Sequence, residues 1–134
     1  MKLSKECEYA ILALVDIAQS PEDLVKINDI AKRNHIPKKF LEQILLTLKR
    51  TGYVASKRGI GGGYKLIKEA DEITIAEVVR LFDGALAPVD SVSENFYEET
   101  PIEKNQKLLA IFKELRDYVS NKLENTTIYD LLKE

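Results

Sequence analysis

Four polar side chains in the middle of this sequence are spaced so that they could hydrogen-bond to the edges of nucleic-acid bases. They are Lys38, Lys39, Glu42 and Gln43. Lysine donates to guanine O6 and N7 or to phosphate, glutamine can pair with adenine through two hydrogen bonds, and glutamate accepts from cytosine N4. A carboxylate among cations is costly beside phosphates, so Glu42 is interpreted as a residue that selects sequence. The alternative is an ordinary solvated helix face.

A helix over residues 37–51 is predicted to carry these side chains. Pro37 suits its first turn, where the missing N–H would have had no partner. An apolar face with a period of 3.6 residues turns the polar residues outward. That face consists of Phe40, Leu41, Ile44, Leu45 and Leu48.

A shorter helix is expected before it, capped by Asn28 and touching the second helix through Ile30 and Ala31. The turn between the two helices lacks the usual glycine. Asn34 and His35 are both candidates for a left-handed conformation there. The two helices together are typical of a helix-turn-helix.

A glycine-rich hairpin follows, with strands expected over residues 53–57 and 63–67. Arg58 stands at the base of the loop, residues 58–62. Glycines let backbone N–H groups approach phosphates, and an arginine can enter a narrow minor groove. The hairpin is therefore predicted to form a wing beside the second helix. A dinucleotide-binding loop is excluded, since Tyr64 occupies the third glycine position and a strand follows.

The charge distribution favours a polyanionic partner. Residues 26–68 hold eleven basic and two acidic residues, a net +9, whereas residues 1–25 carry −3 and residues 69–134 carry −8. A polyanion would be attracted to the middle of the chain and repelled by the rest. Double-stranded DNA is the predicted partner. The residues predicted to contact it are Asn28, Lys38, Lys39, Glu42, Gln43, Lys49, Arg50, Arg58, Gly59, Gly61, Gly62, Gly63 and Tyr64.

The remaining elements are expected to support this unit. Residues 3–19 form a helix that is apolar almost all round, which implies burial on more than one side. Thr74 and Glu77 have the capping-box spacing for a helix over residues 75–82. The predicted fold is mainly α with a small β-hairpin. It comprises a winged helix-turn-helix domain over residues 1–83, a variable loop over 84–101, and a dimerisation helix with a C-terminal tail over 102–134.

An apolar stripe marks the long helix expected over residues 102–123. It is too apolar to remain exposed, so it needs the first helix, a second copy of the chain, or both as a partner surface. The tail, residues 126–132, could pack over its own domain or over the other subunit. The residues predicted to form the homodimer interface are Leu108, Ile111, Phe112, Leu115 and Val119.

Several other functions are not expected. The sequence has no apolar run of ~18–20 residues that could cross a bilayer and no signal-peptide pattern, so a cytoplasmic location without membrane contact is predicted. One cysteine, Cys7, and one histidine, His35, cannot supply a disulfide or a protein-only metal site in a single chain. Cys7 is interpreted as a buried structural residue, with a redox or ligand role as the alternative. No catalytic spacing is present, so an enzyme is not predicted.

The chain resembles the Rrf-two family of bacterial winged-helix transcription regulators. The resemblance lies in Tyr9-Ala10, the Phe-Leu-Glu-Gln of residues 40–43, the glycine-rich residues 58–64 and the tail at residues 126–131. It implies a dimer joined through the C-terminal helix and a palindromic operator. Cluster-binding members carry three cysteines within residues 85–101, where this chain has none. No cofactor is therefore expected, and the chain looks closer to the cluster-free branch that contains a cysteine-metabolism repressor.

The predicted function is that of a sequence-specific DNA-binding transcription regulator, a repressor acting as a homodimer. The alternative is a winged-helix interaction or sensor module that is regulated by a partner enzyme or a small ligand.

Overall fold

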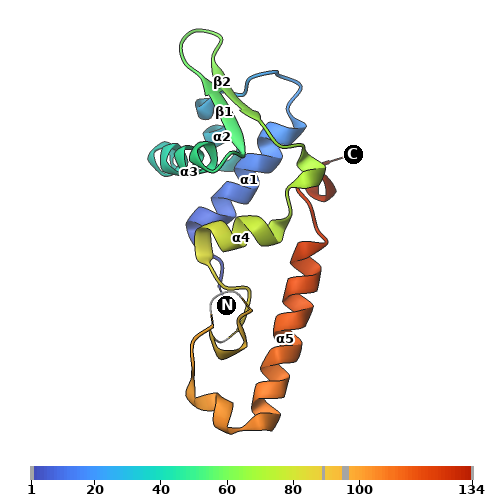
Figure 1. Ribbon diagram of the computed structural model, residues 1–134. Coiled ribbons are helices and arrows are strands. Elements are labelled where there is room, and N and C mark those ends of the chain that lie inside the picture. The colour runs from blue at the N-terminus through green and yellow to red at the C-terminus, as the bar shows by residue number, and fades with distance from the viewer. Residues whose placement is uncertain (1, 89, 95–96, 134) are drawn as a thin grey trace.

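Helix α1 (Lys5–Gln19) is the element around which the upper part of the molecule packs (Figure 1). The structure is a computed structural model and describes residues 2–88, 90–94 and 97–133. Ser4 caps α1, since its Oγ accepts a hydrogen bond of 3.1 Å from the Cys7 N–H. Ala10, Ala13 and Leu14 are fully buried. The expected burial of this helix on more than one side is confirmed by its contacts with α2, α3 and α4.

The other helices and strands follow in an order that matches the predicted class, mainly α with a small β-hairpin. They are α2 (Ile27–Asn34), α3 (Lys38–Arg50), β1 (Val54–Lys57), β2 (Gly63–Leu66), α4 (Ile75–Asp83) and α5 (Gln106–Glu124). The two strands are antiparallel, with Val54 opposite Leu66 and Lys57 opposite Gly63. Short 3-10 turns lie at Ala70–Glu72, Asp90–Val92, Pro101–Lys104 and Tyr129–Leu131.

The turn between α2 and α3 uses His35, one of the two predicted residues. Its φ of 53° is left-handed. The expected cap at Asn28 is wrong: α2 begins at Ile27 after Lys26, and within the described chain no side chain caps this helix end. The physical reason is a tertiary bridge. Val25 and Tyr64 exchange two backbone hydrogen bonds of 2.8 Å, which holds the chain extended up to the helix start.

Helix α3 packs on α1 through four side chains that are at most 2% exposed, Leu41, Ile44, Leu45 and Leu48. Phe40, predicted for the same face, is 41% exposed and lies edge-on to the Tyr9 ring with 5.7 Å between ring centroids. The apolar period therefore predicted the orientation of α3 correctly, with its first aromatic residue at the border of the core.

The C-terminal tail returns to its own winged-helix domain. Ile128 is fully buried in the main core, and its N–H donates to the Ile73 carbonyl at 2.9 Å. A second backbone hydrogen bond of 2.8 Å joins the Ile75 N–H to the Thr126 carbonyl. Of the two alternatives for the tail, the structure places it on the domain that precedes it.

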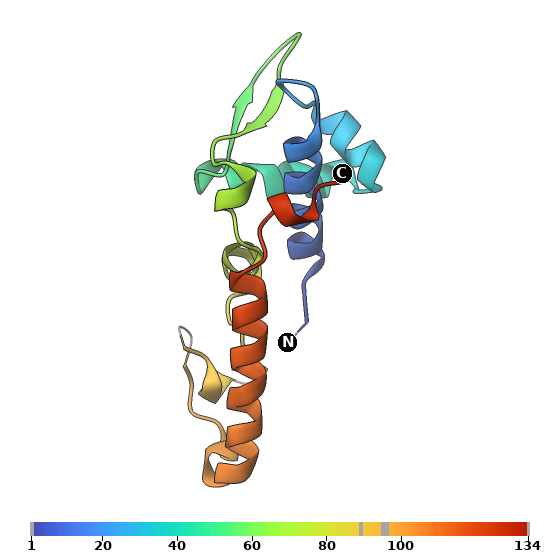
Figure 2. The ribbon, with the colours of Figure 1, turned by 90° about the vertical axis from the view of Figure 1, so that its right-hand side faces the viewer.

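Helix α5 extends away from the winged-helix domain in both views (Figures 1 and 2). It begins at Gln106, four residues later than predicted, because Pro101–Lys104 forms a 3-10 turn and Asn105 then caps the helix. The preceding loop packs along it, where Ala87, Val92 and Leu109 form a second small core. At its other end, an ion pair between Arg80 and Glu124 ties α5 to α4.

None of the helices within residues 2–88, 90–94 and 97–133 is both long and apolar enough to cross a bilayer.

Candidate nucleic-acid interface

A groove between α3 and the β-hairpin brings together residues that lie far apart in the sequence. The volume of the groove is about 290 Å³. Helix α3 contributes Glu42, Gln43 and Lys49, and the hairpin contributes Arg58 and Tyr64.

 The two separate stretches predicted to contact DNA therefore meet along one open, polar groove.

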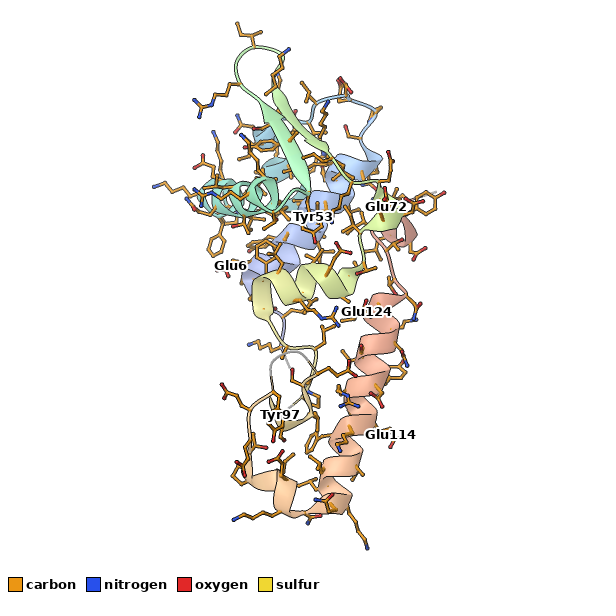
Figure 3. The ribbon with its side chains drawn as sticks, viewed as in Figure 1. Glu6, Tyr53, Glu72, Tyr97, Glu114 and Glu124 are labelled. Carbon is orange, nitrogen blue, oxygen red and sulfur yellow. The ribbon has the colours of Figure 1, made fainter. Side chains whose placement is uncertain are left out.

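Many side chains project outward from α3 (Figure 3). Lys38, Lys39, Glu42, Gln43, Lys49 and Arg50 are all exposed. Lys39 and Gln43 also line a second, larger pocket of about 530 Å³, whose apolar wall includes Phe40, Leu81 and Phe82. The outward face of α3 therefore carries mostly hydrogen-bonding side chains, although Phe40 and Leu46 are also exposed there.

The glycines of the hairpin fall into two groups. Gly59 and Gly61 have left-handed φ angles of 89° and 77° at the exposed tip. Gly62 and Gly63 are buried and have no room for a side chain. A Cβ on Gly62 would lie 2.2 Å from the Lys57 carbonyl oxygen, and one on Gly63 would lie 2.7 Å from that of Val25. The Gly62 N–H already donates to the Gly59 carbonyl at 3.0 Å, so it is not free for a phosphate.

Two polar residues of α2, Asn28 and Arg33, do not line this groove. Asn28 is exposed in the first turn of α2 and is not among the residues that line the groove. Arg33, counted in the basic segment, is engaged by Asp16 of α1, with its Nε and Nη2 donating to the carboxylate at 3.0 and 2.7 Å. Asp16 is only 6% exposed. The hydrogen bonds to Asp16 raise the pKa of Arg33. They also join α2 to α1, so this arginine stabilises the fold.

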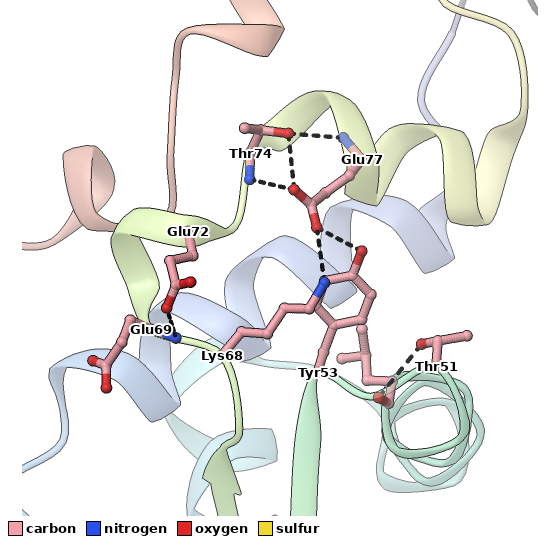
Figure 4. Close-up of polar contacts among 8 residues, drawn as sticks. Thr51, Tyr53, Lys68, Glu69, Glu72, Thr74 and Glu77 are labelled. Atoms are coloured by element: carbon pink, nitrogen blue, oxygen red, sulfur yellow. Dashed lines mark hydrogen bonds and ion pairs between the residues drawn. The ribbon is translucent and has the colours of Figure 1, made fainter.

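A polar cluster joins the base of the wing to α4 (Figure 4). The Tyr53 hydroxyl, directly before β1, donates to Glu77 Oε1 at 2.7 Å. Thr74 donates to Glu77 Oε2 through its N–H at 3.0 Å and its hydroxyl at 3.2 Å. Lys68, after β2, lies 3.7 Å from the same carboxylate and 4.6 Å from the centre of the Tyr53 ring. The predicted capping box is confirmed, and its glutamate also holds both ends of the hairpin.

These contacts shift two pKa values in opposite directions. Burial and the bond to Glu77 raise the pKa of the Tyr53 phenol. Burial alone would raise the pKa of Glu77, but the donors from Thr74 and Tyr53, with the charge of Lys68, outweigh it and lower the pKa below its usual 4.5. Glu77 therefore stabilises the fold fully above about pH 4.5, and this contribution is lost as the pH falls through the lower folded-state pKa.

Replacing Glu77 with glutamine is expected to lower the free energy of unfolding at neutral pH by about 1–2 kcal/mol, because charged acceptors make the stronger hydrogen bonds. It should also flatten the loss of stability between neutral pH and about pH 3. Urea unfolding at both pH values measures this, with exposed Glu98→Gln as the control. An equally steep acid dependence in Glu77→Gln and the unmodified protein would contradict the assignment.

Cys7 is buried beside Asp83, whose carboxylate accepts hydrogen bonds from both the N–H and the hydroxyl of Ser4. Burial first, then the charges of Asp83 and Glu8, raise the pKa of the thiol to about 12. Since the thiolate is the reactive form, labelling of the folded protein by an aromatic disulfide reagent at neutral pH should be at least ~100-fold slower than labelling in urea. Rapid labelling of the folded chain would show that Cys7 is accessible and reactive.

A helix-turn-helix followed by a β-hairpin, with exposed polar residues on both, defines a winged-helix protein of the transcription-regulator class. Residues 3–134 match the Rrf2 family model, described as iron-dependent transcriptional regulator. The chain therefore belongs to the Rrf2 family of transcriptional regulators.

Individual proteins similar to this chain are also named as HTH-type transcriptional regulators. The chain is 30% identical to the HTH-type transcriptional regulator CymR of Bacillus subtilis over 132 residues, 98% of this chain and 89% of the relative. It is 42% identical to an rrf2-like HTH-type regulator of Rhodobacter capsulatus over 101 residues, 72% of this chain and 67% of the relative. The solved structure of CymR, the global cysteine regulator of B. subtilis, superposes with a TM-score of 0.76 and covers 98% of this chain and 95% of that one at 30% identity.

The residues of this chain do not fit an iron–sulfur cluster, although the family description mentions iron. Such clusters are held mainly by cysteine thiolates. Cys7 is the single cysteine, and it is buried with a raised pKa, while the single histidine, His35, lies in the turn between α2 and α3. Within the described ranges, no three side chains of histidine, cysteine, aspartate or glutamate are grouped as metal ligands.

Sequence reasoning missed two features of this region. Ile60, at the tip of the wing, gives no hydrogen-bonding signal in the sequence because it is apolar, yet its side chain is fully exposed. The link from Tyr53 to Glu77 spans 24 residues, and nothing in either local pattern indicates it.

Proposed function

We propose that this protein is a sequence-specific transcriptional repressor that binds a palindromic DNA operator as a homodimer. The observation that carries the proposal is the groove shared by α3 and the wing, where Gln43, Lys49 and Arg58 lie together. Helix α3 enters the major groove and the wing follows the neighbouring backbone and minor groove. Two such units would read half-sites about 34–36 Å apart.

The exposed face of α5 supports the homodimer. Leu108, Ile111, Leu115 and Tyr118 follow one another at steps of three and four residues and are 36%, 53%, 46% and 70% exposed. Phe112 instead packs against the small core of its own chain. A regular row of exposed apolar side chains is typical of a helix that pairs with another helix. The row extends from the winged-helix domain and would hold two domains at a fixed separation.

Selection of duplexes from a random pool by the purified protein tests the proposal and supplies the operator. Replacing Glu42 with alanine should then relax the base preference at the position that Glu42 reads, with a change of about 1–3 kcal/mol in discrimination. Competition between the selected duplex and single-base variants measures this. If Glu42→Ala changed affinity equally for every variant, Glu42 would be a general contact and not a specificity residue.

We further propose that regulation does not use an iron–sulfur cluster, which places this chain with the cluster-free members of its family. The support is the absence of cysteine from residues 85–101. Protein purified without oxygen should be colourless, with the intact mass of the polypeptide alone. An absorption band in the visible region would contradict this.

A sensor or interaction module is the second candidate, favoured by the pocket beside Lys39 and Gln43 and by the acidic C-terminal half. A partner protein or small ligand bound in that pocket would cover part of the outward face of α3. The two candidates are separated by salt dependence: an interaction module would show no DNA affinity that falls with ionic strength and would tolerate loss of the basic residues.

A further inference from the structure

Ile60 has a large apolar side chain that is exposed to solvent in the folded subunit. Its relative exposure is 107%, so no part of the described chain covers it. The loop that carries it projects from the end of the hairpin, away from α1 and α5 (Figure 1). Because the side chain buries nothing in the folded subunit, packing within the subunit does not explain it.

The backbone of the loop is arranged to present this side chain. The hydrogen bond from the Gly62 N–H to the Gly59 carbonyl, 3.0 Å long, closes a four-residue turn with Ile60 in its second position. The third residue, Gly61, has the positive φ that a type II turn requires. Ile60 bears the single side chain within residues 59–63, since the other four are glycines. The tip is therefore narrow and ends in one apolar group.

The position of the tip relative to the groove indicates what it would meet. Arg58 and Lys57, which directly precede the turn, line the same groove as Glu42 and Gln43 of α3. With α3 in the major groove, the hairpin faces the adjacent minor groove, which is about 6 Å wide. A single aliphatic side chain flanked by glycines fits such a width. Minor-groove proteins insert isoleucine, leucine or phenylalanine between base steps and thereby kink the duplex.

We propose that Ile60 acts as an apolar wedge in the minor groove, so that the protein bends its operator and prefers a flexible pyrimidine–purine step beneath the wing. This inference rests on the proposed DNA-binding function. Unstacking is easiest at TA and CA steps, so the wedge selects sequence through deformability without a hydrogen bond to any base. Arg58 holds the wing to the DNA by charge, while Ile60 determines which steps it accepts.

The test compares Ile60→Ser with Ile67→Ser on a duplex selected from a random pool by the unmodified protein. Ile67 is a matched control, because it is 58% exposed and lies beyond β2, outside the tip. Fluorescence energy transfer between the duplex ends reports bending, and 2-aminopurine placed beneath the wing reports unstacking. Ile60→Ser should bind about 10-fold more weakly, with a smaller bend and no rise in 2-aminopurine fluorescence. Ile67→Ser should behave as the unmodified protein.

A second duplex, with a stiff A-tract in place of the flexible step, should weaken binding of the unmodified protein but leave Ile60→Ser almost unaffected. The wedge is overturned if Ile60→Ser bends, unstacks and discriminates like the unmodified protein. The two failures are distinguishable, because loss of the proposed function itself would appear as no DNA binding by the unmodified protein, which would overturn both proposals.

Discussion

Replacing both Ile111 and Leu115 with aspartate is expected to dissociate the proposed homodimer and to lower affinity for a palindromic operator at least ~100-fold. The two side chains are 53% and 46% exposed in the single chain, so the change should leave the subunit folded. Two carboxylates in the middle of an apolar helix pair would have to be desolvated without a partner. Each monomer would then bind one half-site, without the high effective concentration that linkage gives the second.

Sedimentation or light scattering would report the change in mass, and fluorescence anisotropy the change in affinity. Ala110→Asp combined with Asn121→Asp is a matched control, because it adds the same two charges to exposed positions on a different face of α5. Circular dichroism should show the same helix content in both variants. A dimeric double variant that binds the operator normally would mean that α5 does not form the interface.

Replacing Arg58 with alanine is expected to lower DNA affinity about 10- to 100-fold and to reduce the dependence of affinity on salt. Arg58 is exposed at the base of the wing and lines the groove beside Gln43 and Lys49. Each phosphate contact contributes about 0.9 to the slope of log affinity against log salt concentration. A dimer loses two such contacts, so the slope should fall by about 2.

Titrations at several salt concentrations give both quantities in one experiment. Lys104→Ala is the control, because it removes the same charge from the 3-10 turn before α5, at the far end of the molecule from the wing. Equal slopes for Arg58→Ala and the unmodified protein would show that Arg58 does not contact phosphate. A loss of affinity shared by Lys104→Ala would reflect net charge and not a local contact.

The sequence by itself determined the features that depend on neighbouring residues. The apolar period of α3, the Thr74–Glu77 capping box and the left-handed residue at the turn were all predictable. Hydrogen bonds between residues three or four apart and the direction of side chains on a helix depend on local spacing. The face that α3 turns outward, and with it most of the candidate interface, therefore followed from the sequence.

Only the tertiary structure decided which charged residues and glycines are available to contact DNA and which are used within the fold. Arg33 is neutralised by Asp16, 17 residues earlier, and Gly63 is required because the backbone of Val25 passes beside it. The same bridge moved the start of α2 away from Asn28, and packing of the loop against Leu109 turned Phe112 toward its own chain. Contacts between distant segments leave no periodic signal in the sequence, because each partner satisfies its local pattern equally well without the other.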